Sequence, residues 1–236
     1  MNNRFQVKQF RYGNDNLAYV IFGKRAALAV DGGAVTEILA FIAAQGLTLT
    51  HIAHTHGHWD HTMGTRQLLA QSDATQLRPE DLLEDEGLML ESGRIQVFGT
   101  PGHTMDSLVF HVEGFLITGD TLFNGTIGNC FSGDRQAFYR SISYLCSFPD
   151  ETVIYAGHDY VEASMQFARM IEPENPDIGP YLAKYDPRHV FSTLADEKKV
   201  NPYLRFNAPE MIAVLKKRGL PTDTEYERWL SLMSIE

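Results

Sequence analysis

The chain has 236 residues, 44% of them hydrophobic and 21% charged, which is ordinary for one large globular domain or a domain with an appendage. A formal net charge of −10 opposes contact with a phosphate backbone, so nucleic acid is not an expected partner. No apolar run reaches the roughly 18 residues of a membrane-spanning helix, so no membrane partner is expected. The first residues lack a secretory apolar stretch and the two cysteines form no disulfide framework, so we expect a cytoplasmic protein.

Short runs with strand-like composition, separated by turn residues, occupy much of the chain before residue 156. We predict strands over residues 4–12, 17–22, 26–30, 49–53, 95–98, 108–112, 115–118 and 152–155. Helical spacing of apolar residues predicts helices over residues 34–44, 63–71, 135–146 and 161–171. This mixture predicts an α+β protein in which two sheets pack face to face with helices outside them.

The composition changes at the Pro-containing segment 172–176, which predicts a division of the chain there. Residues 1–172 would form the catalytic domain, and residues 173–236 would form a C-terminal helical region. Within that region we predict helices over residues 178–185, 209–218 and 224–233. About 60 residues of this kind hold only a thin core alone, so we expect them to pack on the first domain as a substrate-binding lid.

The segment that follows the fourth predicted strand is the densest group of potential metal ligands in the chain. It contains His56, His58, Asp60 and His61, with Trp59 expected to pack between the two pairs. Imidazole nitrogen and carboxylate oxygen are the usual ligands of zinc-class cations. Four donors are one more than a catalytic zinc takes from the protein, so the spacing predicts a site shared between two ions.

Three further potential ligands, His103, Asp120 and His158, each follow a predicted strand and a glycine. The glycine allows close approach of the backbone at the strand end. Asp31 also follows a strand, and we expect it to accept a hydrogen bond from a ligand histidine and orient it. We do not expect the remaining histidines to be ligands; they are His51, His54, His111 and His189.

The combined set of five histidines and two aspartates resembles the metal site of the metallo-β-lactamase superfamily. The resemblance implies an αββα four-layer sandwich, here with a C-terminal helical extension, and two divalent metal ions at one edge. It assigns one ion to His56, His58 and His103, a second ion to Asp60, His61 and His158, and a bridging position to Asp120. Zinc is the expected metal, although iron and manganese accept the same mixed nitrogen and oxygen set.

Several runs outside the ligand set are similar to those of the glyoxalase II, or hydroxyacylglutathione hydrolase, family. They are residues 118–123, 157–160, 167–169, 192–197 and 201–205. This resemblance implies hydrolysis of a small thioester, with a metal-bridging hydroxide attacking the carbonyl and Asp60 and Asp120 as the catalytic carboxylates. The leaving thiolate has an intrinsic pKa near 8.5, so it needs little help from a general acid.

The substrate contacts of the family are only partly present. Tyr160 matches the tyrosine that follows the last ligand histidine, but Asn129 and Phe131 stand where the family has a lysine and a tyrosine that bind glutathione. Loss of a lysine–carboxylate contact removes a charge-assisted bond worth roughly 1.5–3 kcal/mol. Weak affinity for glutathione, or a thioester of another thiol, is therefore an open alternative.

Two other functions are compatible with the ligand set. A mononuclear iron persulfide dioxygenase would use His56, His103 and Asp120 as a two-histidine, one-carboxylate set. A metal-binding scaffold without turnover would also keep every ligand position. Oxygen uptake without thioester cleavage would identify the first alternative. The oligomeric state is left open by the sequence.

Overall fold

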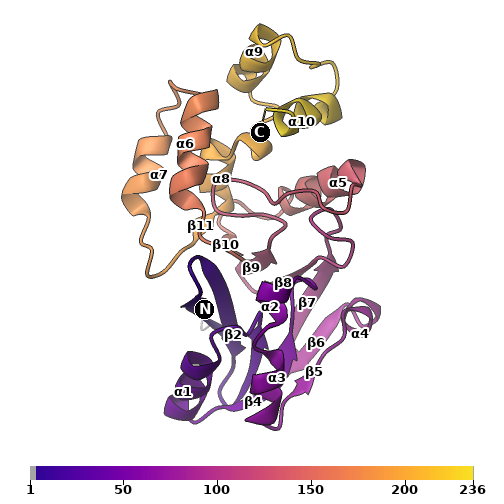
Figure 1. The fold of residues 1–236 in the computed structure, drawn as a ribbon, viewed down its shortest axis with the longest axis vertical. Coiled ribbons are helices and arrows are strands. Elements are labelled where there is room, and N and C mark those ends of the chain that lie inside the picture. Colours follow the sequence, from indigo (N-terminus) through magenta and orange to yellow (C-terminus); the bar gives the residue numbers. More distant parts are fainter. Residues whose placement is uncertain (1–3, 236) are drawn as a thin grey trace.

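The computed structural model describes residues 4–235, which form two sheets packed face to face (Figure 1). The first sheet has the order β1 (Gln6–Tyr12), β2 (Asn16–Phe22), β3 (Ala26–Val30), β4 (Thr48–Ala53), β5 (Thr75–Gln76). The second has the order β11 (Ser192–Thr193), β10 (Val153–Ala156), β9 (Phe115–Gly119), β8 (Leu108–Val112), β7 (Gly93–Gly99), β6 (Gly87–Leu90). Both are mixed, since β3 pairs parallel with β4, and β9 with β10.

Helices connect and cover the two sheets. We call residues 173–235 the tail. The helices before it are α1 (Val35–Gln45), α2 (Trp59–Thr62), α3 (Thr65–Ala70), α4 (Pro79–Glu84), α5 (Arg135–Leu145) and α6 (Val161–Ile171). Those of the tail are α7 (Ile178–Lys184), α8 (Leu194–Val200), the 3-10 helix η1 (Pro202–Leu204), α9 (Pro209–Lys217) and α10 (Glu225–Met233). Among the helices of residues 4–235, none combines the length and apolarity needed to cross a bilayer.

The main core lies between the two sheets. Successive strand side chains point to opposite faces, so Tyr19 and Ile21 of β2 face inward while Val20, between them, faces outward. The inward residues meet Phe110 of β8 and Ile117 of β9 from the other sheet. Packing of two such apolar faces is the sandwich arrangement.

Helices bury the outer face of each sheet. Ile38 of α1 and Leu68 of α3 pack over the first sheet, and Phe138 of α5 packs over the second. The order of layers is therefore helix, sheet, sheet, helix, which confirms the predicted αββα sandwich. Figure 1 shows α9 and α10 beyond α5, at the opposite end of the molecule from α1.

The tail is joined to the sandwich rather than separate from it. The short strand β11 pairs antiparallel with β10 and extends the second sheet. Trp229 of α10 is fully buried against Phe138 of α5, with ring centroids 5.8 Å apart. Division of the chain after residue 172 stays a prediction, and these contacts mean that any two such parts share a core.

The histidine run differs from the predicted loop followed by one helix at 63–71. It begins the short helix α2, and a break at Gly64 separates α2 from α3. A Cβ at Gly64 would lie 2.1 Å from the carbonyl oxygen of Gly32, so the chain passes too closely there for any larger residue. The segment is therefore held against the end of β3, where the site forms.

Candidate metal centre

Strands from both sheets end at one edge of the sandwich, and the polar side chains that follow them meet there. Asp31 follows β3, His56 and His58 follow β4, His103 follows β7, Asp120 follows β9, and His158 follows β10. Glycine makes this convergence possible, because a Cβ at Gly157 would lie 2.2 Å from Asp120 Oδ1. Gly119, at φ 50°, likewise has the Thr55 side chain where a Cβ would be.

The first donor group consists of His56, His58, His103 and Asp120, whose ligand atoms all lie within 4.8 Å of one another. His58 Nδ1 is 2.9 Å from His56 Nε2 and 3.1 Å from His103 Nε2. Asp120 Oδ2 is 3.5 Å from His103 Nε2. Three ring nitrogens and one carboxylate oxygen thus lie close enough together to bind one zinc-class cation.

The second donor group consists of Asp60, His61 and His158, again with ligand atoms within 4.8 Å of one another. The Nε2 atoms of His61 and His158 are 3.3 Å apart. Asp120 faces this group as well, with Oδ1 3.3 Å from His61 Nε2 and Oδ2 3.4 Å from His158 Nε2. The position between the two groups is the one expected for a bridging carboxylate.

The outer partners of His61 and His103 fix which ring nitrogen is free when each ring is neutral, the form that binds a metal ion. The Nδ1 of His61 lies 3.0 Å from an Asp31 oxygen, and that of His103 lies 2.9 Å from the carbonyl oxygen of Asn129. These acceptors require a proton on Nδ1, so each neutral ring directs a bare Nε2 lone pair inward. Asp120 Oδ1 is also buried and has no hydrogen-bond partner. Converging lone pairs and an orphaned carboxylate oxygen fit a divalent cation.

Burial and neighbouring charges shift the pKa values of the site residues in the metal-free chain in opposite directions. Burial disfavours a charged ring, but Asp31 and Asp120 outweigh it and raise the pKa of His61 to about 11. Burial and the charge of His61 lower the pKa of His56 to about 4. Burial also opposes ionisation of Asp120, yet the His158 and His61 rings that face its carboxylate hold its pKa well below the usual range.

Metal binding is expected to release protons at pH 8. At that pH the His61 ring is protonated without metal, because its pKa of about 11 lies higher, and a ligand imidazole must be neutral. Calorimetric titration in two buffers of different ionisation enthalpy should therefore give a release of about one proton or more per chain. The Asp31→Asn variant should release less, because a charge that raises the His61 pKa is gone. Identical heats in both buffers would contradict this protonation.

The predicted substrate contacts lie beside the two donor groups. The Phe131 ring, 66% exposed, packs edge-on against His103 at 5.2 Å and against His58 at 5.6 Å between centroids. The Tyr160 ring stacks on His158, with centroids 5.1 Å apart and planes within 3°. The backbone of Asn129 is engaged with His103. One aromatic side chain thus flanks each group, and its contact with substrate stays a prediction.

Two features differ from what the sequence indicated. Trp59 does not pack between the ligand pairs; its side chain is 73% exposed because α2 turns it toward solvent. Asp15, in the turn between β1 and β2, lies 3.0 Å from His158 Nδ1, and no sequence signal distinguishes it from an ordinary turn aspartate. The histidines not expected to be ligands, His51, His54, His111 and His189, are absent from both donor groups.

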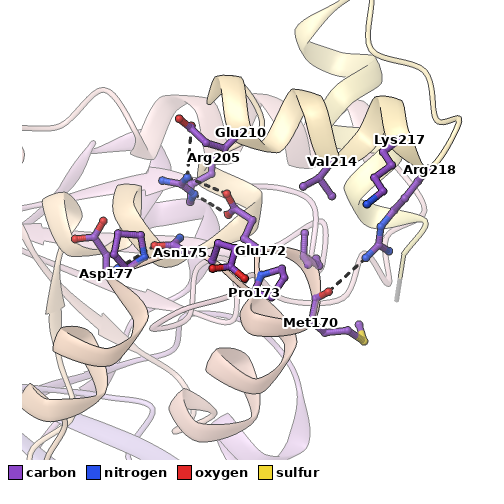
Figure 2. Close-up of a pocket in the computed structure, with 13 residues that line it drawn as sticks. Met170, Glu172, Pro173, Asn175, Asp177, Arg205, Glu210, Val214, Lys217 and Arg218 are labelled. Carbon is purple, nitrogen blue, oxygen red and sulfur yellow. Dashed lines mark hydrogen bonds and ion pairs between the residues drawn. The ribbon is translucent and has the colours of Figure 1, made fainter.

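A cavity of about 850 Å³ lies away from the donor groups, between the end of α6, the loop after it and α9 (Figure 2). Both arginines that line this cavity have partners. Arg205 binds both carboxylate oxygens of Glu172 at 2.8 and 2.9 Å and lies 4.0 Å from Glu210. Arg218 donates to the carbonyl oxygen of Met170 at 3.5 Å. None of its lining residues is a donor residue, so the cavity is separate from the metal centre.

Solved structures share this fold. A protein titled BLEG-1 B3 metallo-beta-lactamase superposes with a TM-score of 0.64 at 20% identity, covering 84% of this chain and 99% of that one. ETHE1 from Myxococcus xanthus superposes with a TM-score of 0.62 at 25% identity, covering 96% of this chain and 99% of that one. The αββα sandwich is therefore a known architecture.

Sequence comparisons identify the family. The model of the metallo-beta-lactamase superfamily matches residues 11–85 and 75–158, and a model described as hydroxyacylglutathione hydrolase C-terminus matches residues 159–229. The hydroxyacylglutathione hydrolase of Anaeromyxobacter dehalogenans is 36% identical over 88% of this chain and 88% of its own. That of Chromohalobacter salexigens is 31% identical over 82% of this chain and 83% of its own. This chain belongs to the hydroxyacylglutathione hydrolase family of the metallo-β-lactamase superfamily.

Proposed function

We propose that this protein is a metal-dependent hydrolase of hydroxyacylglutathione-type thioesters. The observation that carries the proposal is a pair of donor groups that share Asp120, in a chain whose relatives are named hydroxyacylglutathione hydrolases. Zinc is the metal we propose first, and iron or manganese would fit the same donors. The two cysteines are unpaired, which suits a reducing compartment such as the cytoplasm.

In this proposal the residues divide between two ions. His56, His58 and His103 would hold one, Asp60, His61 and His158 would hold the other, and Asp120 would contact both. Bound divalent ions at such a site supply a hydroxide nucleophile at neutral pH and polarise the carbonyl. Asp31 keeps the proton of His61 on Nδ1, and the carbonyl of Asn129 does the same for His103. These contacts keep the Nε2 atoms free to act as ligands.

The remaining chemistry needs little from the protein. Addition of hydroxide to the carbonyl carbon and cleavage of the carbon–sulfur bond yield a carboxylic acid and a thiolate, and the acid then loses its proton to solvent. With a thiol pKa near 8.5, the thiolate leaves without a general acid. Phe131 and Tyr160, one beside each donor group, would flank the substrate, and residues 173–236 would contribute to its binding surface.

A thioester panel tests this function. We expect metal-loaded protein to hydrolyse S-lactoylglutathione, with a high KM because Asn129 replaces the lysine of the family. The Asn129→Lys variant should lower that KM about tenfold or more, since one charge-assisted bond is worth roughly 1.5–3 kcal/mol. Coenzyme A thioesters and simple thiol esters serve as comparison substrates, with metal content measured on the same samples. Oxygen consumption with glutathione persulfide, without cleavage of any thioester, would overturn the proposal.

A further inference from the structure

The turn between β1 and β2 reaches across the sandwich to the second donor group. Asp15 Oδ1 lies 3.0 Å from His158 Nδ1, and the backbone carbonyl of Asp15 accepts a hydrogen bond from Asp159 N at 2.9 Å. Asn16 forms an isolated antiparallel bridge with His158. The loop that carries His158 is thus bonded to this turn through both side chain and backbone.

The same turn also holds Asp60, the half-buried member of the second group. Asn16 Nδ2 donates to Asp60 Oδ2 at 3.0 Å, and the Tyr12 hydroxyl donates to the backbone carbonyl of Asp60 at 2.8 Å. A Cβ at Gly33 would lie 2.1 Å from the Tyr12 ring, so the ring is packed closely against the end of β3. Residues 12–16 therefore position two of the three residues in the second group.

Contacts outside the site fix the turn in place. Arg11 forms an ion pair with Asp159, and its guanidinium donates to the carbonyl oxygen of Pro187 at 2.9 Å. The Tyr185 hydroxyl donates to Asp159 Oδ2 at 2.7 Å. Leu17 N donates to the carbonyl oxygen of Gly157 at 2.8 Å. The turn is thus braced by the loop containing His158 and by the start of the tail.

The first donor group receives no such support. Within residues 4–235, the hydrogen bonds of residues 12–16 do not extend to His56, His58 or His103. His56 Nδ1 contacts the Thr55 hydroxyl at 3.1 Å, and His103 is backed by a backbone carbonyl. The two halves of the site are therefore oriented by different parts of the chain.

We propose that Asp15 is the positioning residue of His158, and that residues 12–16 control occupancy of the second metal position without controlling the first. The inference rests on the proposed metal role of the two donor groups. A carboxylate behind a ligand histidine fixes its tautomer and its ring orientation, and loss of such a partner costs 10–100-fold in metal affinity. Asp15 would do for His158 what Asp31 does for His61.

Metal binding by the Asp15→Ala variant of the full chain tests the proposal. We expect two ions per wild-type chain, and in the variant a second ion bound about 10–100-fold more weakly, with the first unchanged. Stepwise Co²⁺ titration, followed by the absorption spectrum and by metal analysis after desalting, separates the two positions. Asp15→Asn keeps an acceptor oxygen and should restore much of the affinity. Asp73→Ala, an exposed aspartate outside the site, is the matched control.

A second variant guards against a folding defect. Asn16→Ala removes the contact to Asp60 instead and should weaken binding of the same second ion. The far-UV circular dichroism spectrum of this variant should stay that of wild type. The inference would be overturned if both ions bound equally more weakly, or if the affinity for the second ion were unchanged in both variants. Binding of only one ion by the wild-type chain would also overturn it. Because the readout is metal binding, a protein that loads two ions but cleaves no thioester would reject the proposed substrate and leave this inference standing.

Discussion

Replacement of Asp120 by asparagine is expected to remove most of the hydrolytic activity. The two Asp120 oxygens lie 3.3–3.5 Å from ring nitrogens of both donor groups, on His61, His103 and His158. An amide at this position supplies no negative charge and turns a nitrogen toward one group. Since metal-assisted charge stabilisation is worth several kcal/mol and each 1.4 kcal/mol is tenfold, kcat/KM should fall by roughly 10²–10⁴.

The measurement is steady-state hydrolysis of S-lactoylglutathione, with metal content determined on the same preparations. We expect Asp120→Asn to retain fewer than two ions and to lose activity mainly in kcat. Asp73→Asn makes the same chemical change at an exposed position and should behave as wild type. Unchanged hydrolysis in Asp120→Asn would remove Asp120 from the bridging position.

The fold could be predicted where its signals are local. The strand of residues 108–112 and the helix of residues 161–171 have the predicted bounds, because apolar spacing and turn residues define both ends. Elements β5 and β11 were not predicted, since each has two residues, which is too few for alternation to show. Helix α8 was also missed, although the capping box between Thr193 and Asp196 is a sequence signal for its start.

At the site, too, residues with a local sequence signal could be predicted and residues placed by long-range contacts could not. The seven predicted ligands meet because each follows a strand end, and strand ends at one edge of a sandwich are neighbours. Asp15 could not be found in this way, because its contact with His158 spans 143 positions and depends on how the two sheets pack. The exposure of Trp59 likewise depends on how α2 lies on the sandwich. Local spacing predicts the candidate ligands, whereas their positioning depends on tertiary contacts.

One buried carboxylate adds hydrogen bonds between the tail and the sandwich to the β10–β11 pairing and the Trp229–Phe138 contact. Glu197 of α8 is fully buried and accepts hydrogen bonds from Gly125 N at 2.8 Å and from the hydroxyls of Ser192 and Tyr181 at 2.7 Å each. Asn201 Nδ2 donates a fourth at 2.9 Å. The Gly125 contact crosses from the tail to the loop after Asp120. Loss of this carboxylate would leave several buried donors without a partner.

The Glu197→Ala variant is therefore expected to unfold at a much lower temperature. Each orphaned buried donor costs roughly 1–3 kcal/mol, so a loss of at least about 3 kcal/mol is expected even if water replaces some contacts. At roughly 2–4 °C per kcal/mol for a chain of this size, Tm should fall by about 6–12 °C or more. Thermal unfolding of metal-loaded protein measures it, with the exposed Glu151→Ala as control. Because Gly125 lies in the loop that follows Asp120, the same variant should also bind metal less tightly. A wild-type Tm would mean that the β10–β11 pairing and the apolar contacts hold the tail without the Glu197 hydrogen bonds.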